Sequence, residues 1–127
     1  MGRQRQELGK LGEELAASYL QEKGYRLLER NYRCRLGEID IVALDGDVLV
    51  FVEVRCRTSG RFGLPQESIR REKQAKLRKL AQYYLLRAAR SGPAPATGKN
   101  QVRFDVLALL FDCEQVSYRI EHIQNAF

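Results

Sequence analysis

The sequence predicts one α/β domain over residues 1–127, built on a mixed sheet flanked by helices. Segments with helical periodicity and segments with strand-like alternation follow one another in the order α-β-β-β-α-β-β. An Asp-Gly pair between two apolar, β-branched segments marks a hairpin within this order. The composition, 44% apolar and 30% charged, is typical of a globular domain with a buried core.

The first half of the chain is expected to contain one helix and three strands. The helix covers residues 12–23, and Gly24 ends it as a C-cap glycine. Strands follow over residues 25–32 and 38–44, and the Asp-Gly turn leads into a strand over residues 47–57. The apolar positions behind these assignments are Leu11, Leu15, Tyr19 and Leu20 in the helix and Val48, Val50, Val52 and Val54 in the last strand.

The second half is expected to contain one long helix and two strands. After a glycine-containing loop over residues 58–64, the helix begins at residue 65 or 66 and ends at residue 90. Residues 91–100 hold glycine and proline in a pattern typical of a loop. Strands follow over residues 101–111 and 116–123. The helix is predicted from an apolar stripe formed by Ile69, Leu77, Leu80 and Tyr84.

Composition excludes several classes of protein. No run approaches the roughly 20 apolar residues that a membrane helix needs. Residues 1–10 are polar and basic and do not form a secretory signal, so we expect a cytoplasmic protein without a membrane partner. Cys34, Cys56 and Cys113 form no CxxC pair, which favours reduced packing thiols over a disulfide framework or a zinc site. His122 is the single histidine, which excludes chemistry that needs two and favours a structural role.

The chain is basic, with 22 Lys and Arg against 16 Asp and Glu and a net charge of +6. A basic surface attracts polyanions such as nucleic acid or anionic lipid. Basic side chains crowd the predicted long helix, and we expect this helix to contact nucleic acid, with DNA favoured over RNA. A solvated basic face is the alternative. The candidate nucleic-acid-binding residues are Arg70, Arg71, Lys73 and Arg78.

Carboxylates come close together on the predicted hairpin. With the Asp-Gly pair as a two-residue turn, Glu38 falls opposite Glu53. Asp40 falls opposite Phe51 and diagonal to Glu53, at a Cα separation of roughly 7–8 Å that long side chains can bridge. Strand alternation puts Glu38, Asp40, Phe51, Glu53 and Arg55 on one face and Ile39, Ile41, Val50, Val52 and Val54 on the other.

Opposed carboxylates destabilise a sheet unless a cation lies between them. Hard oxygen ligands suit Mg²⁺ or Mn²⁺, which makes Asp40 and Glu53 candidate metal ligands and Glu38 an accessory carboxylate. A solvated acidic edge paired with arginines is the alternative, although charged residues within apolar strands are costly unless paired. A metal in a basic protein predicts phosphodiester hydrolysis, in which the metal activates water and Arg55 orients that water or stabilises the developing negative charge.

Two motifs resemble those of a known superfamily. The segments Gly-Glu-Ile-Asp-Ile-Val at residues 37–42 and Phe-Val-Glu-Val-Arg at residues 51–55 are similar to those of the PD-(D/E)XK nucleases. The chain more closely resembles the small YraN-like members, endonucleases related to Holliday-junction resolvases. The likeness extends over nearly the whole chain, through Gly9 to Glu13 with Ala16 and Leu20, Asn31-Tyr32-Arg33, Arg103-Phe104-Asp105-Val106 and Asn125-Ala126-Phe127.

This resemblance implies a restriction-endonuclease-like αβββαβ core forming a single nuclease domain. It implies Asp40 and Glu53 as catalytic residues that bind Mg²⁺ or Mn²⁺. It also implies Glu13, on the first helix, as an accessory catalytic carboxylate. A solvated position, like that expected for the neighbouring Glu14, is the alternative for Glu13. By analogy with resolvases, which act on two-fold junctions, it further suggests a homodimer.

One residue departs from the superfamily pattern. A lysine is expected two residues after the second carboxylate, where this sequence has Arg55. Arginine keeps the positive charge but does not release a proton, and its planar group has a different reach. Lys73, on the helical line of the apolar stripe, is a candidate substitute that points toward the site. A lysine that extends to solvent from the edge of the stripe is the alternative.

The sequence leaves three functions open. The first is a metal-dependent endonuclease acting on DNA, with branched or single-stranded forms as candidate substrates. The second is a catalytically impaired nucleic-acid-binding module that retains the nuclease fold, which Arg55 favours. The third is a protein-interaction factor whose basic helix contacts an acidic partner.

Overall fold

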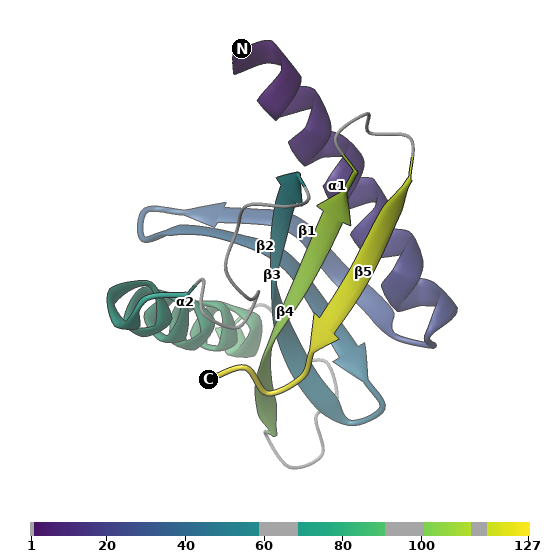
Figure 1. Cartoon of the computed structure of the whole chain (residues 1–127). Coiled ribbons are helices and arrows are strands. Elements are labelled where there is room, and N and C mark those ends of the chain that lie inside the picture. Colours follow the sequence, from purple (N-terminus) through teal and green to yellow (C-terminus); the bar gives the residue numbers. More distant parts are fainter. Residues whose placement is uncertain (1, 59–68, 91–100, 113–116) are drawn as a thin grey trace.

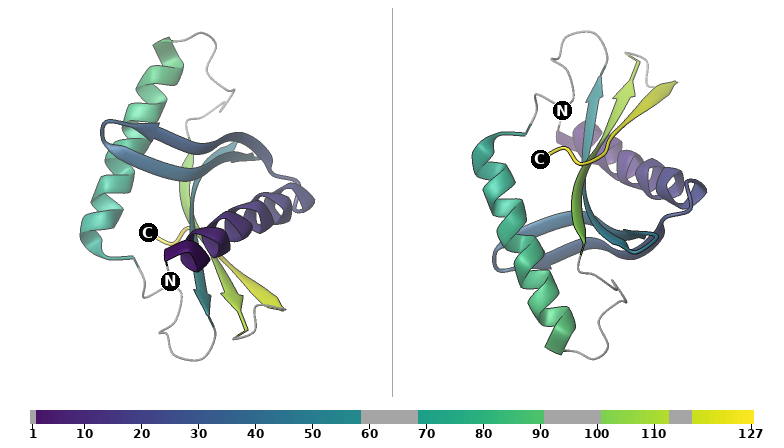
Figure 2. Two further views of the ribbon diagram at one scale, coloured as in Figure 1. Left: turned by 90° about the horizontal axis from the view of Figure 1, so that it is seen from above. Right: turned by 90° about the horizontal axis from the view of Figure 1, so that it is seen from below.

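The computed structural model describes residues 2–58, 69–90, 101–112 and 117–127 of the protein. A five-stranded mixed sheet lies between two helices, one on each face (Figure 1, Figure 2). This arrangement confirms the predicted α/β fold and is compatible with a restriction-endonuclease-like core. The elements are α1 (Gly2–Glu22), β1 (Arg26–Cys34), β2 (Gly37–Asp45), β3 (Val48–Thr58), α2 (Arg71–Arg90), β4 (Val102–Phe111) and β5 (Tyr118–Ile123).

The strands lie side by side in chain order, β1-β2-β3-β4-β5. Neighbouring strands are antiparallel except β3 and β4, which are parallel. Parallel neighbours need a crossover connection, and α2 lies in the segment that joins these two strands. The predicted order α-β-β-β-α-β-β is therefore confirmed, with β3 as the central strand.

Both helices begin at other residues than the sequence predicts. α1 already begins at Gly2, and its Leu8 extends the apolar stripe toward the N-terminus and packs against the core. In α2 the first helical hydrogen bond runs from the N–H of Gln74 to the carbonyl of Arg70, at 3.0 Å. The Gln74 side chain donates to the carbonyl of Ile69 at 3.1 Å. These two bonds fix the start of the helix, so Ile69 and Arg70 precede it.

Parts of the predicted second half lie outside the described residues. This applies to residues 59–68, which include most of the glycine-containing loop and the predicted start of the long helix. It also applies to the loop over residues 91–100 and to residues 113–116, which include the third cysteine. Cys34 and Cys56 are free thiols, as expected. No described helix is long and apolar enough to cross a membrane.

The hairpin between β2 and β3 closes one residue later than the sequence predicts. Asp45 pairs with Val48, so that Gly46 and Asp47 form the two-residue turn. Gly46 has a φ of 60° and Asp47 does not have a positive φ, which is the pattern of a type II′ turn with glycine at its first position, where glycine avoids a Cβ clash. The predicted turn would have required this conformation of Asp45 instead. The register is therefore shifted by two residues, and Leu44 pairs with Leu49 rather than Asp47.

This shift separates Glu38 from Glu53. The ladder between β2 and β3 ends where Ile41 pairs with Val52. Asp40 and Glu53 follow immediately beyond this last pair. The predicted pairing of Glu38 with Glu53 is therefore wrong, and Asp40 is the carboxylate that lies next to Glu53.

The predicted alternation of faces fails at Ile39. Ile41, Val50 and Val52 pack in the cluster covered by α1, as one face of the hairpin. Ile39 instead packs in the cluster covered by α2. The part of β2 that precedes Ile41 does not pair with β3 and bends together with β1 toward α2 (Figure 2). This bend turns Asp40 away from the face shared with Phe51.

Each helix packs its apolar face against one side of the sheet, and β3 contributes alternate residues to both cores. The central position of β3 buries Glu53, which is 8% exposed. Among the residues that the structure describes, Glu53 and Asp105 are the buried charged side chains, and such groups require partners. The helix residues buried in the two cores are Ala16, Ala17 and Leu20 in α1 and Leu77, Leu80, Ala81 and Tyr84 in α2.

Candidate active site

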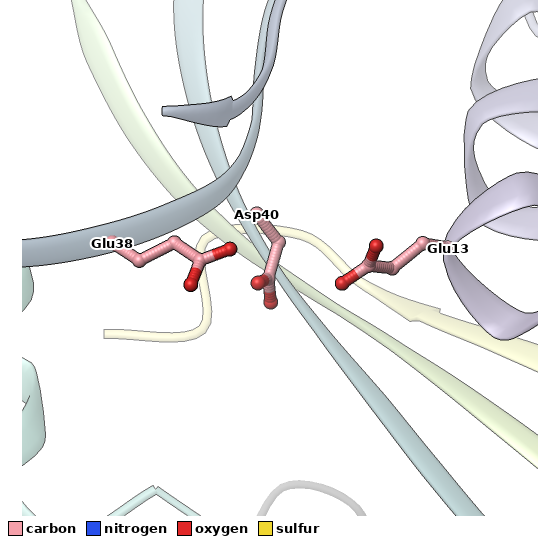
Figure 3. Close-up of side chains that lie close together, drawn as sticks. All are labelled: Glu13, Glu38 and Asp40. Carbon is pink, nitrogen blue, oxygen red and sulfur yellow. The ribbon is translucent and has the colours of Figure 1, made fainter. Parts of the chain in front are cut away.

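Three carboxylates converge between α1 and β2, namely Glu13, Glu38 and Asp40. One ligand oxygen of each lies within 4.8 Å of those of the other two. Figure 3 shows Asp40 in the middle, with Glu38 directed toward it from one side and Glu13 from the other. Carboxylate oxygens that gather in this way suit a hard divalent cation.

Glu13 and Glu14 have different partners. Glu13 faces Asp40, whereas Glu14 forms a surface ion pair with Arg30 at 3.0 Å. The Glu14 side chain is 69% exposed. Of the two adjacent carboxylates, Glu13 is therefore the one that the fold directs into the cluster.

Asn31 on β1 contacts the same cluster, although no sequence pattern gave it a role. It has a φ of 54°, in the left-handed region that asparagine tolerates better than most residues. With its amide nitrogen turned toward the carboxylates, it donates to Glu38 at 3.0 Å and to Glu13 at 3.3 Å. A neutral donor thus bridges two acidic side chains. Asparagine is depleted in strands, so its presence within a strand is the signal that sequence reasoning could have used.

Asp40 is in an environment that disfavours its charge. Burial, a hydrogen bond to Glu53 and the negative charges of Glu53 and Glu13 together raise the pKa of Asp40 to about 8. The N–H of Val54 donates to Asp40 Oδ2 at 2.8 Å and partly offsets this effect. A nearby cation would favour the ionised carboxylate. The charges around Asp40 therefore do not neutralise its carboxylate, and the ionised form would be stabilised by an added cation.

Two cations contact the buried Glu53. Lys73 of α2 forms an ion pair with its Oε2, and Arg55 Nη2 lies 4.0 Å from the same oxygen. The Arg55 side chain is 16% exposed, and its buried Nε has no hydrogen-bond partner among the described residues. Lys73 therefore points toward the site and not to solvent alone, which was the alternative left open by the sequence.

Lys76, one turn further along α2, lies against the start of β2. A Cβ at Gly37 would come within 2.9 Å of Lys76 Cε, and Gly37 has a φ of 140° that side chains rarely adopt. Glycine at this position thus allows the lysine side chain to lie close to the β2 backbone. The same strand carries Glu38 and Asp40, so α2 brings two lysines to the region of the carboxylates.

The other candidate nucleic-acid-binding residues are exposed, on α2 or immediately before it. Arg70 and Arg71 are exposed at the start of α2, next to Lys73. Arg78 is also exposed, and its guanidinium carbon lies 5.3 Å from the ring centroid of Phe127. Glu72 is the single acidic residue of α2, so the helix is strongly basic.

Residues 12–109 match a family described as "Uncharacterised protein family UPF0102". This chain belongs to the UPF0102 family. A UPF0102 protein of Pelotomaculum thermopropionicum is 53% identical, with 94% of each chain covered. Those of Syntrophus aciditrophicus and Moorella thermoacetica are each 48% identical, covering 94% and 97% of this chain and 87% and 97% of their own. The YraN-like resemblance is thus confirmed at the level of the family, and the carboxylates and lysines described above lie within the matched residues.

A second buried polar network in this UPF0102 domain centres on Asp105. Its carboxylate accepts hydrogen bonds from Arg103 at 2.8 Å and from the Asn125 N–H at 3.0 Å, and it contacts His122 Nε2 at 2.8 Å. Burial acts to raise the pKa of Asp105, but the hydrogen bonds from His122, Arg103 and Asn125 outweigh it and hold the pKa below its usual range.

The same network of the UPF0102 domain extends to α1, to β2 and to Tyr25, which lies between α1 and β1. Arg103 also donates to Asp45 at 3.0 Å and to the Tyr25 hydroxyl at 2.6 Å. The Tyr19 hydroxyl of α1 lies 3.3 Å from His122 Nδ1. These contacts connect α1, the β2–β3 hairpin, β4 and β5. His122 therefore has the structural position that a single histidine suggested.

Proposed function

We propose that this UPF0102 protein is a divalent-metal-dependent endonuclease that hydrolyses DNA phosphodiester bonds. The observation that supports it best is the convergence of Glu13, Glu38 and Asp40 beside Glu53, which itself contacts Lys73. Carboxylates and a lysine gathered at one point of a basic chain suit a metal and a phosphate together. The resemblance to PD-(D/E)XK nucleases points to the same chemistry.

Asp40 and Glu53 are the proposed ligands of Mg²⁺ or Mn²⁺, with Glu13 and Glu38 as further carboxylates. Their fit to a dication rests on the convergence of the carboxylate oxygens and on the raised pKa of Asp40, which reflects burial first and then the nearby charges of Glu53 and Glu13. A bound ion would lower the pKa of a coordinated water and neutralise charge on the phosphate. The chain itself would orient the reactants through these carboxylates and exclude bulk water from the buried Glu53.

Lys73 and Arg55 have separate roles in this proposal. Lys73, held on Glu53 by its ion pair, can orient the attacking water or stabilise the charge that develops on the phosphate. Arg55 keeps its proton, so it can only stabilise charge. Lys73, from α2, thus supplies the compact cation that the superfamily pattern expects from a lysine at the position of Arg55.

DNA is the proposed substrate, and branched or single-stranded forms are the first to test. The exposed Arg70, Arg71 and Arg78 would hold the flanking phosphates. A homodimer, which would match a two-fold DNA junction, is part of the same proposal.

The decisive test is metal-dependent cleavage by the purified protein. Supercoiled plasmid, four-way junction and single-stranded DNA would be incubated with Mg²⁺ or Mn²⁺, and with EDTA. Asp40→Asn and Glu53→Gln should each reduce cleavage at least 100-fold, on the order expected for loss of a group that supports the reacting centre. Asp47→Asn, which changes an exposed carboxylate in the β2–β3 turn, should not. Cleavage that survives EDTA or both site substitutions would contradict the proposal.

A second candidate is a nucleic-acid-binding module that retains the fold but has lost catalysis. The observation in its favour is that Lys73 engages the Glu53 oxygen that a metal would need, while Arg55 stands in the usual lysine position. Salt-sensitive DNA binding without calorimetric Mn²⁺ binding and without cleavage would support this function. Mn²⁺ binding that is lost in Asp40→Asn would argue against it.

A further inference from the structure

A cavity of about 680 Å³ lies next to the carboxylates, between the N-terminal half of α1 and the C-terminal half of β3. It shares Glu13 with the carboxylate cluster. It also shares Val54, whose N–H binds Asp40. Its volume falls within the range of small-molecule sites, roughly 300–1,000 Å³. The remaining lining residues are Leu8, Gly9, Cys56, Arg57 and Thr58.

Two glycines of α1 have different relations to β3. A Cβ at Gly12 would overlap the sulfur of Cys56, so glycine is needed there for the helix to contact the strand. Among the residues that the structure describes, a Cβ at Gly9 would meet nothing within 4 Å. Glycine inside a helix destabilises it relative to alanine, and no packing contact with a described residue accounts for its use at Gly9. Its effect is to leave the cavity open one turn before the contact at Gly12.

The cavity combines apolar side chains with the Arg57 cation, and the Glu13 carboxylate lies at the side shared with the carboxylate cluster. Leu8 and Val54 are apolar, and burial raises the pKa of the Cys56 thiol to about 11, so the sulfur is neutral at physiological pH. Arg57 donates from Nη1 to the Cys56 carbonyl at 2.9 Å, which holds its guanidinium beside the cavity. An apolar surface next to a planar cation matches a nucleotide, with its flat base and its charged phosphate.

We propose that this cavity binds one unpaired nucleotide adjacent to the bond that is cut. Its base would lie between Gly9 and β3, and its phosphate would face Arg57. The inference rests on the nuclease function proposed above and specifies its substrate as DNA with an unpaired nucleotide at the cleavage site. A base within a duplex enters such a cavity only after extrusion, and extrusion costs least where the base is already unpaired.

The test fills the cavity with a side chain introduced at Gly9. Gly9→Phe places a ring in the cavity, Gly9→Ala adds only a methyl group, and Ser18→Phe places the same ring on an exposed position of the same helix. Thermal unfolding would establish that each variant folds. Binding would be measured in EDTA, so that no metal-dependent cleavage occurs, with forked DNA carrying 2-aminopurine at the unpaired position and with the matched fully paired duplex.

Gly9→Phe should bind the forked DNA at least tenfold more weakly than Gly9→Ala and should lose the 2-aminopurine fluorescence change. Both proteins should bind the paired duplex alike, and Ser18→Phe should match wild type. Equal binding of the fork by Gly9→Phe and Gly9→Ala would overturn the inference. An equal loss on fork and duplex would overturn it as well.

A second variant changes Arg57, on the β3 side of the cavity, so that the inference can be tested even if Gly9→Phe does not fold. Arg57→Gln removes the cation while keeping a long polar side chain, and it should weaken fork binding selectively by about tenfold. An equal loss of binding to forked and paired DNA in Arg57→Gln would contradict the inference, whether or not Gly9→Phe folds. The two proposals fail separately, because a wild-type protein that never cleaves contradicts the nuclease function, whereas unchanged fluorescence in Gly9→Phe contradicts only the nucleotide cavity.

Discussion

Lys73, in the first turn of α2, forms an ion pair with Glu53, the buried carboxylate of the central strand β3. Arg55 approaches the same carboxylate from its own strand, at 4.0 Å. An ammonium is a compact charge with three rotatable donors, whereas a guanidinium is planar and does not release its proton. We therefore expect Lys73, and not Arg55, to perform the catalytic role of the cation.

Replacing Lys73 with methionine should lower the single-turnover rate of DNA cleavage by about 10²–10³-fold, as for the loss of one charge-stabilising donor. Arg55→Lys should stay within about tenfold of wild type, because it keeps a cation near Glu53. Lys79→Met is the matched control, since Lys79 is an exposed lysine of the same helix. Loss of cleavage in Arg55→Met together with full activity in Lys73→Met would reverse the assignment.

The sequence predicted that Asp40 and Glu53 lie close together, because strand alternation and the Asp-Gly signal define a hairpin. It could not predict the register, since the turn can form around Asp45-Gly46 or Gly46-Asp47. A type I′ turn around Asp45-Gly46 needs a positive φ at Asp45, whereas a turn around Gly46-Asp47 needs one only at Gly46, and the chain adopts the second arrangement. That choice separates Glu38 from Glu53 and brings Asp40 next to Glu53.

The rest of the site depends on contacts between distant segments. Helical periodicity placed Lys73 near the core face of its helix, but the hydrogen bonds of Gln74 decide where that helix begins. Glu13 reaches Asp40 because Gly12 allows α1 to lie against Cys56. Such contacts join positions far apart in the chain, and local sequence patterns do not encode them.

The thermal stability of the metal-free protein should fall between pH 6 and pH 8.5. The pKa of Asp40 is raised from 3.8 to about 8 in the folded protein, chiefly by burial and Glu53. The stability that its protonated form contributes is complete below the unfolded pKa and is lost as the pH rises through about 8. Differential scanning fluorimetry at both pH values measures this loss, which Asp40→Asn should remove.

Mn²⁺ at about 1 mM should raise the melting temperature more at pH 8.5 than at pH 6, because a cation favours the ionised form of Asp40. Asp47→Asn, in the exposed turn, should show the same metal response as wild type. A metal shift that is equal at both pH values, or that persists in Asp40→Asn, would contradict the assignment of Asp40 as a ligand.

Charge reversal at the exposed arginines on α2 and immediately before it should weaken DNA binding and its salt dependence together. Each phosphate contact contributes a slope of roughly 0.9 to the dependence of log affinity on log salt concentration. Arg70→Glu, Arg71→Glu and Arg78→Glu should therefore each reduce the slope by about one, measured by fluorescence anisotropy. Arg26→Glu, at an exposed position of β1, makes the same charge change elsewhere. If Arg26→Glu has the same effect, only net charge matters and α2 is not a specific contact.

Asp105→Asn should lower the free energy of unfolding by about 3 kcal/mol, because it leaves Arg103 without its buried carboxylate. Urea denaturation measures this change. Glu121→Gln is the control, since its ion pair with Arg119 lies at the surface and should be worth less than about 1 kcal/mol. The pKa of Asp105 is lowered, so its contribution is present above the unfolded pKa and is lost as the pH falls through the folded one. Equal effects of the two substitutions would contradict a stabilising role of the network.

Gly12→Ala should destabilise the protein by about 1–3 kcal/mol, even though alanine is the better helix former, because the new methyl group overlaps the sulfur of Cys56. Combining it with Cys56→Ala removes the overlap and should recover most of this loss, giving a coupling of about 1 kcal/mol or more in a double-mutant cycle. Gly9→Ala, whose methyl group meets none of the described residues, should instead be neutral or stabilising. Relief of the overlap by movement of α1 would carry Glu13 away from Asp40, so Gly12→Ala should also bind Mn²⁺ more weakly by calorimetry. Full stability of Gly12→Ala with unchanged metal binding would show that the contact with Cys56 does not position Glu13.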